Sequence, residues 1–559
     1  MLASFLTLAV LALLLFRRPL MAGFAEPADF VVAFTSQMLG DLGLHRLELA
    51  GLLGGPELNY LLTKTGPLAI VAHVFVNLMG GSSPAGQLAF LLALHLLVAI
   101  TAMYVAQAWR PDHDGSIAAG VLIVLHPLTI GALAGLSNLP AILAAEFTLL
   151  TILLCIDIAR TGRFKLCLPA MLMGTLATSC DVTGWLAFPA AVLALFCSPT
   201  RDRSKSRLRR AAVAFIILVG VSLPVIYLSI TIGPYFYLDF TPVLNPARWA
   251  RYAAWILRGV FLTADPAPYI ADERIGILFI AICAAATISL TAVIARRRLA
   301  LLVWIGLAIV AFIPRAYDLA WPDPEAAAGV FAAFYLPMIF IGLWAAELLP
   351  GTASPRLRQI TLVLMLVVVL PQTFLLTERL ARRAEKVNQL GRELIHLTDQ
   401  APAGADIMLI AKPKAASLVE AAFLAAQYQN PPTKQVRFRL VLAGRLIPRE
   451  PTAPLGRQFG VMTRLPFTNQ NVVIGLNADA THLLDLTGMI HSKIALADDV
   501  IATEGHAPPE WPLVDETSIN AWPIGANCNK PELARLSAHS WFVEAIFFGL
   551  QPHLGRAPL

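Results

Sequence analysis

Apolar segments that could cross a bilayer recur along the first two thirds of this 559-residue chain and end near Leu376. A hydrocarbon core about 30 Å thick requires roughly 20 apolar residues per helix, and fewer where a segment turns back at a polar break. Hydrophobic residues make up 57% of the chain and charged residues 14%, far from the average of soluble globular proteins. The sequence therefore predicts a polytopic membrane protein.

The expected fold class is mainly α, with about eleven membrane segments in a helical bundle over residues 1–377. A small α/β or α+β extracytoplasmic domain is expected over residues 378–559, because strand-like "DIMLIA", "VRFRLVLAG" and "NVVIGL" alternate with helical "SLVEAAFLAAQY". The expected membrane segments are Leu2–Phe16, Gln87–Ala108, Ile117–Ile130, Leu139–Ile158, Leu166–Ser179, Gly184–Phe196, Ala211–Ile232, Ile275–Ile294, Ala300–Ile313, Val330–Leu349 and Thr361–Leu376.

Basic residues indicate the orientation, because Lys and Arg are held on the cytoplasmic side during insertion. The short loops of one side carry most of them: Arg110, Arg160, Arg163, Lys165, the six within 201–210, Arg296–Arg298, Arg356 and Arg358. With that side cytoplasmic, the Pro19–Gly86 loop and the C-terminal domain lie outside. Arg17 and Arg18 disagree with this orientation, and the first segment is read as an anchor rather than a cleaved signal.

Two short hairpins interrupt the series of spans. The first enters at Ile117, turns around His126–Asn138 and returns by Ile158, with Pro127 and Pro140 bracketing the turn, where proline costs few helix hydrogen bonds. The second carries Asp181 at its tip, in "LCLPAMLMGTLATSCDVTGWLAFPAAVLALF". An acidic side chain at this depth is costly to bury and tends to be functional.

Several motifs together resemble a known family. They are a Gly-Gly-x-x-Pro turn at Gly80–Pro84, His95 within a span, "HPLTIGALAGLSNLPAILAAEFTLL", the "SCD" hairpin tip and "FYLP" at Phe334–Pro337. Residues 1–380 with these motifs resemble the GT-C superfamily of polytopic glycosyltransferases, and among them the protein O-mannosyltransferase-like enzymes of the transmembrane and tetratricopeptide-repeat type. No such repeat is visible in the tail.

The resemblance implies transfer of a hexosyl or pentosyl group from a polyprenyl-phosphate-linked donor to an acceptor at the extracytoplasmic face. A carboxylate would deprotonate the acceptor, and cations would hold the departing phosphate. The implied catalytic residues are Glu26, Asp29 and Asp181, with Asp41 as a further acid in the first loop. The implied residues for substrate or lipid phosphate are Lys64, His126, Asn138, Arg248, Arg251 and Arg258.

This sequence also departs from the family pattern. Glu26 and Asp29 are separated by two residues where the family places adjacent acids, Cys180 stands where a lysine is expected, and "GVFAAFYLP" lacks the Glu and Arg of its relatives. The alternative function is therefore a catalytically silent GT-C-like relative that serves as a structural subunit of a membrane protein assembly. A transporter is a third reading, but internal inverted repeats are not evident.

Each site residue also has a purely structural interpretation. His126 and Asn138 could cap a membrane hairpin, Glu26 and Asp29 could be solvated loop charges, and His95 could bond to a neighbouring helix. Asp181 is expected to face an outward cavity, where Lys64 or one of the arginines of the 248–258 segment keeps it ionised. That segment would bind lipid phosphates of any kind if it lies in the interface.

Other classes of site find no support in the sequence. No cofactor is expected with certainty; a divalent cation is possible but not indicated, and no phosphate-binding glycine loop, zinc spacing or nucleophile elbow occurs. The basic run "RDRSKSRLRR" suits the anionic inner leaflet rather than nucleic acid. The expected partners are the sugar donor, an acceptor glycan, lipid or protein, membrane lipids and other membrane proteins, with the chain in a bacterial inner membrane.

Overall fold

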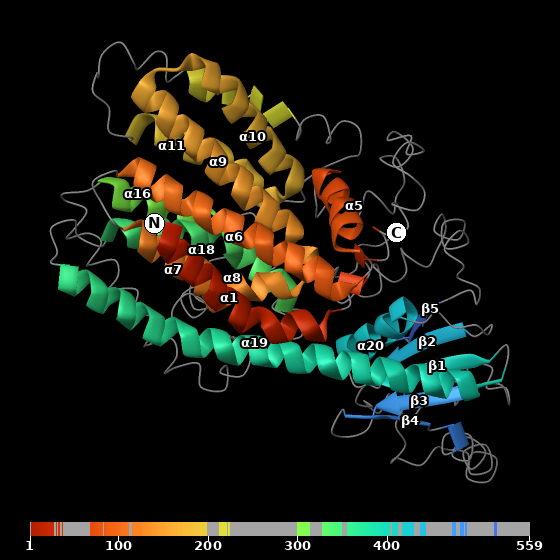
Figure 1. Ribbon diagram of the computed structural model, residues 1–559. Helices are drawn as coiled ribbons and strands as arrows, with labels where there is room; N and C mark the ends of the chain where they lie inside the picture. The colour runs from red at the N-terminus through yellow and green to blue at the C-terminus, as the bar shows by residue number, and fades with distance from the viewer. Residues whose placement is uncertain are drawn as a thin grey trace, which may run out of the picture. The chain divides into compact units, whose positions relative to one another are not determined.

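The protein is mainly helical, with a small mixed sheet near its C-terminus (Figure 1). Its contacts divide it into two compact units: unit 1 is 1–24 with 43–382, and unit 2 is 25–42 with 383–559. The expected boundary after residue 377 remains a prediction. The computed structural model describes residues 2–26, 29–30, 32–33, 36, 67–81, 83–110, 115–197, 212–217, 219–220, 222–223, 299–312, 327–348, 355–402, 405–411, 416–429, 437–442, 472–476, 481–485, 487–488 and 519–522.

Unit 1 is a bundle of apolar helices. Five helices in the described part of the chain are long and apolar enough to cross a membrane, and a bent pair, Ser116–Leu125 with Pro127–Ala134, makes up to six. The helices are α1 (Leu2–Ala22), α5 (Pro67–Gly80), α6 (Pro84–Trp109), α7 (Ser116–Leu125), α8 (Pro127–Gly131), α9 (Leu139–Thr161), α10 (Cys167–Cys180), α11 (Ala187–Cys197), α16 (Leu299–Val310), α18 (Ala327–Leu348) and α19 (Pro355–Gln400). The expected polytopic helical membrane fold is thus present.

Short 3₁₀ turns mark the breaks between these helices. Those described are η2 (Ala132–Ala134), η3 (Leu136–Asn138), η4 (Phe164–Leu166) and η5 (Val182–Leu186). The first two complete the turn between α8 and α9, and η5 follows Asp181. Both expected hairpins are therefore present, and each contains helices too short to cross a bilayer alone.

Three helices differ from the sequence expectations. α5 lies within the segment expected to be an outer loop, because its 14 residues are too few for a span. α1 continues through Pro19 to Ala22. α19 joins the last expected span to the charged segment after Glu378 in one helix of 46 residues that passes through Pro371. The expected segment Ile275–Ile294 lies outside the described residues, and Ala211–Ile232 is described only in part.

Helix contacts in unit 1 depend on small residues. A Cβ atom at Gly342 of α18 would lie 2.9 Å from the Ile123 side chain of α7, and one at Gly131 of α8 would lie 2.4 Å from the Phe331 ring. Glycine at these positions lets the helices approach closely, as is usual in membrane bundles. Large side chains left exposed on α1 and α19, such as Leu14 and Val367, have the apolar character that a lipid environment requires.

Unit 2 contains a five-stranded sheet of order β4-β3-β1-β2-β5. β1 pairs in parallel with β2 and β3, and the two outer strands pair antiparallel. The strands are β1 (Asp406–Ala411), β2 (Arg437–Leu442), β3 (Val472–Leu476), β4 (Leu483–Asp485) and β5 (Ile519–Trp522), and α20 (Ala416–Gln429) lies between β1 and β2 in sequence. The expected α/β alternation of the tail is thus present, with β4 and β5 in addition.

The C-terminal part of α19 packs against α20 in unit 2. A Cβ atom at Gly391 would lie 3.1 Å from the backbone oxygen of Ala422. Ile407 and Leu409 of the central strand are buried. A parallel pair needs a crossover helix between its strands, and α20 fills that place between β1 and β2.

The second hairpin allows a direct test of close packing. A Cβ atom at Gly184 in η5 would lie 2.0 Å from the backbone oxygen of Ala177 in α10, whereas one at Gly306 in α16 meets no atom within 4 Å. Gly184→Ala should lower the free energy of unfolding by about 1–3 kcal/mol, because backbone must move. Gly306→Ala should be neutral or stabilising by up to about 1 kcal/mol, because alanine favours the helix. Thermal unfolding in detergent measures both, and equal effects would contradict the packing described.

Candidate active site

Asp181 lies between two short helices of unit 1. α10 ends at Cys180, and Asp181 adopts an extended backbone conformation and caps η5. Its Oδ1 accepts hydrogen bonds from the backbone N–H of Thr183 at 2.9 Å and from the Thr183 hydroxyl at 2.8 Å. The side chain is fully buried. These two bonds to one oxygen fix the orientation of the carboxylate within the protein.

Chain connectivity places Asp181 at the same end of the bundle as the His126–Asn138 turn. α9 and α10 are packed neighbours joined by a short connection at Gly162, so they run antiparallel. The end of α10 therefore lies near the start of α9, which follows directly on the turn after α7. Asp181 and this turn therefore lie at the same end of the bundle.

His126 and Asn138 both form local hydrogen bonds in the first hairpin. His126 caps α8, with its Nδ1 accepting from the backbone N–H of Leu128 at 3.2 Å. Asn138 donates from Nδ2 to the backbone oxygen of Ala132 at 3.0 Å. Both side chains are buried. These contacts satisfy backbone groups at the break between α7 and α9. This is a structural reason for polar residues within an otherwise apolar segment.

Glu26 and Asp29 belong to unit 2. Glu26 Oε2 forms an ion pair with Arg383 Nη2 at 3.1 Å, and Arg383 also donates to the backbone oxygen of Ala25 at 3.4 Å. Asp29 is fully buried, and its backbone N–H donates to the backbone oxygen of Glu26. Neither acid is an exposed loop charge. Their expected catalytic role remains a prediction, but Glu26 now has a defined structural partner on α19.

The other expected site residues lie outside the described residues. These are Lys64, Arg248, Arg251 and Arg258, together with Asp41. The cations expected to neutralise Asp181 are all in this group, so their role also remains a prediction. In the described part of the chain, no group of three or more His, Cys, Asp or Glu side chains is placed to hold a metal ion.

The bundle contains polar residues that sequence reasoning did not assign to a site. His95 of α6 bonds through Nδ1 to the hydroxyl of Tyr335 in α18 at 2.7 Å. Tyr335 belongs to "FYLP", so two motifs of the family resemblance meet here. The expectation that His95 bonds to a neighbouring helix is confirmed. His73 on α5 is also buried, and its ring nitrogens have no hydrogen-bond partner among the described residues. It was missed because α5 was not predicted.

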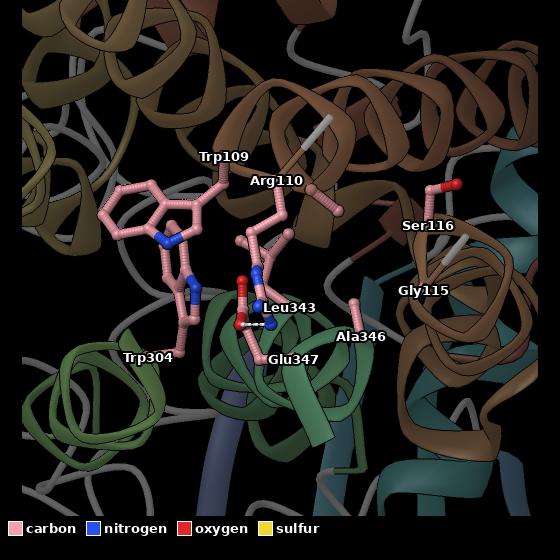
Figure 2. A pocket seen from close by; sticks show the side chains of 9 residues that line it. Trp109, Arg110, Gly115, Ser116, Trp304, Leu343, Ala346 and Glu347 are labelled. Carbon is pink, nitrogen blue, oxygen red and sulfur yellow. Dashed lines mark hydrogen bonds and ion pairs between the residues drawn. The ribbon is translucent and has the colours of Figure 1, made fainter. Parts of the chain in front are cut away.

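A small pocket lies at the other end of the bundle, where α6 ends and α7 begins. Figure 2 shows Arg110 reaching from α6 toward Glu347 of α18, and their Nη1 and Oε2 atoms lie 3.2 Å apart. Trp109 and Trp304 line the pocket beside this pair, with ring centroids 4.8 Å apart. Tryptophan and arginine at helix ends are typical of the membrane–water interface. We assign this pocket no catalytic role, because it lies where α6 ends and α7 begins, whereas Asp181 lies at the end of the bundle where α9 begins.

Comparison with known proteins identifies weak structural likenesses. No protein-family profile matches the sequence, and no similar sequence is found among the curated proteins. One similar solved structure is the Archaeoglobus fulgidus oligosaccharyltransferase in complex with Zn and sulfate, at 15% identity and a TM-score of 0.39, with 75% of this chain and 61% of that chain covered.

A second is the oligosaccharyltransferase AglB from Archaeoglobus fulgidus with an inhibitory peptide and a dolichol-phosphate, at 13% identity and a TM-score of 0.37. It covers 76% of this chain and 63% of that one. This chain thus spans less than two thirds of the length of either protein. The likeness is weak, and no activity, ligand or residue role is transferred from either protein; neither bears on the expected O-mannosyltransferase resemblance.

The role of His126 as a cap can be separated from a role in binding. His126→Ala should lower the free energy of unfolding by about 0.5–2 kcal/mol, because the N–H of Leu128 loses its acceptor. His126→Asn should restore most of this stability, because an asparagine oxygen accepts the same bond. Thermal unfolding in detergent measures both variants. Equal destabilisation by Ala and Asn would show that the cap is not what the imidazole contributes.

The Glu26–Arg383 pair is expected to stabilise unit 2. In a double-mutant cycle of Glu26→Gln and Arg383→Gln, the coupling energy should be roughly 0.5–1.5 kcal/mol, since the pair is only partly shielded from water. The matched control is Arg382→Gln on the adjacent position, whose side chain is 71% exposed and should change stability by less than about 0.5 kcal/mol. A coupling energy of zero would contradict a structural role for Glu26.

Proposed function

We propose that this chain is a membrane glycosyltransferase of the GT-C type. It would transfer a sugar from a polyprenyl-phosphate-linked donor to an acceptor at the extracytoplasmic face. The observation that carries the proposal is the position of Asp181: a fully buried carboxylate at the break between two helices too short to span a membrane. Acidic side chains in such places are costly, and their usual reason is function.

Asp181 has the geometry of a positioned carboxylate. Thr183 holds one oxygen with two hydrogen bonds, so the group is oriented before any substrate arrives. In the proposed reaction the carboxylate accepts the proton of the acceptor hydroxyl as the acceptor oxygen bonds to the anomeric carbon of the sugar. The bond from that carbon to the phosphate oxygen breaks, and the phosphate leaves with the electron pair.

The remaining expected residues complete this proposal. Lys64, Arg248, Arg251 and Arg258 would hold the departing phosphate, where preorganised cations lower the barrier most. Glu26 and Asp29 are retained as candidate acids of the first loop, and His126 and Asn138 would shape the turn beside the site. Membrane lipids and an acceptor glycan, lipid or protein are the proposed partners. The proposed location is a bacterial inner membrane with the C-terminal domain extracytoplasmic.

The second candidate is a catalytically silent relative within a membrane protein assembly. In its favour, one oxygen of Glu26, a candidate catalytic acid, is engaged in an ion pair with Arg383 within unit 2. The missing lysine at Cys180 and the missing charged residues before "FYLP" point in the same direction. The two candidates differ in one measurable property, which is turnover.

The decisive variant is Asp181→Asn. Asparagine keeps an oxygen that can accept from Thr183 and remains a good helix cap, so the hairpin should stay folded. Incorporation of labelled sugar from a polyprenyl-phosphate donor into membrane acceptors should fall about 10²-fold or more, the usual contribution of a general base. Asp157→Asn, a substitution of a half-buried aspartate near the opposite end of α9, is the matched control and should retain activity.

Two outcomes would contradict different parts of the proposal. Full activity of Asp181→Asn would remove this residue from the mechanism while leaving the enzyme class intact. Absence of transfer by the wild-type chain across a panel of donors, together with stoichiometric purification with other membrane proteins, would favour the silent relative. Circular dichroism of each variant shows whether the helical fold is retained.

A further inference from the structure

The interior of the bundle contains two polar pairs between helices that pack together. α6, α9 and α18 contact one another. Thr101 of α6 donates a hydrogen bond to Glu146 Oε1 of α9 at 2.9 Å, and His95 of α6 bonds to Tyr335 of α18. All four side chains are buried, and Glu146 is only 4% exposed. Neither pair uses a residue of the candidate active site.

Glu146 lies well inside its helix rather than at an end. It is about two turns from the start of α9, and Thr101 is about two turns from the end of α6. Both helices are candidate membrane spans. The carboxyl group is therefore surrounded by protein within the hydrocarbon region, where water and lipid headgroups are not available to solvate a charge.

The second carboxyl oxygen of Glu146 is unsatisfied. Oε2 is buried and has no hydrogen-bond partner in the described part of the chain. An ionised carboxylate in this setting costs several kcal/mol or more unless it is paired. Protonation of Oε2 converts the carboxylate to the neutral acid. The cost of burying an unpaired charge then no longer applies.

We propose that Glu146 is the centre of a proton-binding site inside the membrane bundle. The carboxyl group carries a proton at neutral pH, and this proton stabilises the packing of α6 against α9. A metal cation is the competing occupant. Ca²⁺ and Mg²⁺ take six or more oxygen ligands. The Thr101 hydroxyl is the one oxygen that bonds to Glu146 among the described residues, so this site offers too few ligands for such an ion. The site is independent of the proposed glycosyl transfer.

Other titratable groups on the helices packed against α9 must be separated from Glu146. His95 of α6 and Tyr335 of α18 are bonded to each other. Arg110 and Glu347 pair with each other at the pocket end. The others in the described part of these elements are His73 on α5, Tyr104 on α6, Cys155, Asp157 and Arg160 on α9, Lys165 in η4, Cys167 and Cys180 on α10, Asp181 at the hairpin tip and Cys197 on α11. A test must therefore identify the carboxyl group itself.

Infrared spectroscopy of the full chain in lipid nanodiscs makes that identification. The wild type at neutral pH should show the C=O stretch of a protonated carboxyl group, and Glu146→Gln should lose that band. The matched control is Glu347→Gln, which removes the carboxylate paired with Arg110 and should leave the band in place.

Thermal unfolding at a series of pH values gives a second measurement. The midpoint of unfolding should fall as the pH rises in the wild type, because the Glu146 carboxyl group ionises more readily in the unfolded chain. The midpoint should fall less in Glu146→Gln.

A second variant keeps the test decisive if Glu146→Gln does not fold. Thr101→Val removes the hydroxyl that bonds to Glu146 and should shift the frequency of the C=O band without abolishing it. Absence of a protonated carboxyl band in the wild type at neutral pH, or no shift in Thr101→Val, would overturn the proposal. Stabilisation of the wild type by sodium chloride but not by choline chloride, lost in Glu146→Gln, would instead identify a cation as the occupant.

Discussion

The inability of lipid to form hydrogen bonds governs this structure. Wherever the helices break or carry polar side chains, the protein itself has to supply the partner. His126 caps α8, Asn138 closes the turn before α9, and Asp181 caps η5. The polar residues that interrupt the apolar segments are thus the means by which the chain can turn inside a bundle. A functional role for any of them is added to this structural one and does not replace it.

The same constraint decides how much of the fold could be predicted. Apolar length and proline position located both hairpins and the spans that fall in the described part of the chain, because these properties are set within each segment. α5 was not predicted, although it is as apolar as α10 and α11, because its 14 residues are too few for a span and it has no apolar partner segment directly before it that would mark a hairpin. The continuity of α19 through Pro371 was not predicted either. The sequence changes there from apolar to charged residues, which was read as the end of a span, whereas the helix itself continues into a different environment.

The candidate site was less predictable than the fold. Asp181 was found because a single buried acid at a hairpin tip is a local feature. The contacts of Glu26 with Arg383 and of His95 with Tyr335 join residues 357 and 240 positions apart. No pattern of spacing within one segment encodes such pairings. For the same reason Glu146 was passed over, since its significance depends on the absence of a partner that only the packed bundle reveals.

Unit 2 is assembled from two separate parts of the chain, 25–42 and 383–559. During synthesis the first part emerges long before the second, and roughly 340 residues of bundle must be made and inserted between them. At about 5–20 residues per second, this delay lasts from roughly 20 s to about a minute. Throughout that time Phe30, which packs against the ring of Tyr428 in the finished protein, has no partner from the tail. The Phe30–Tyr428 contact of unit 2 can therefore form only after the whole of the intervening part of unit 1 has been synthesised.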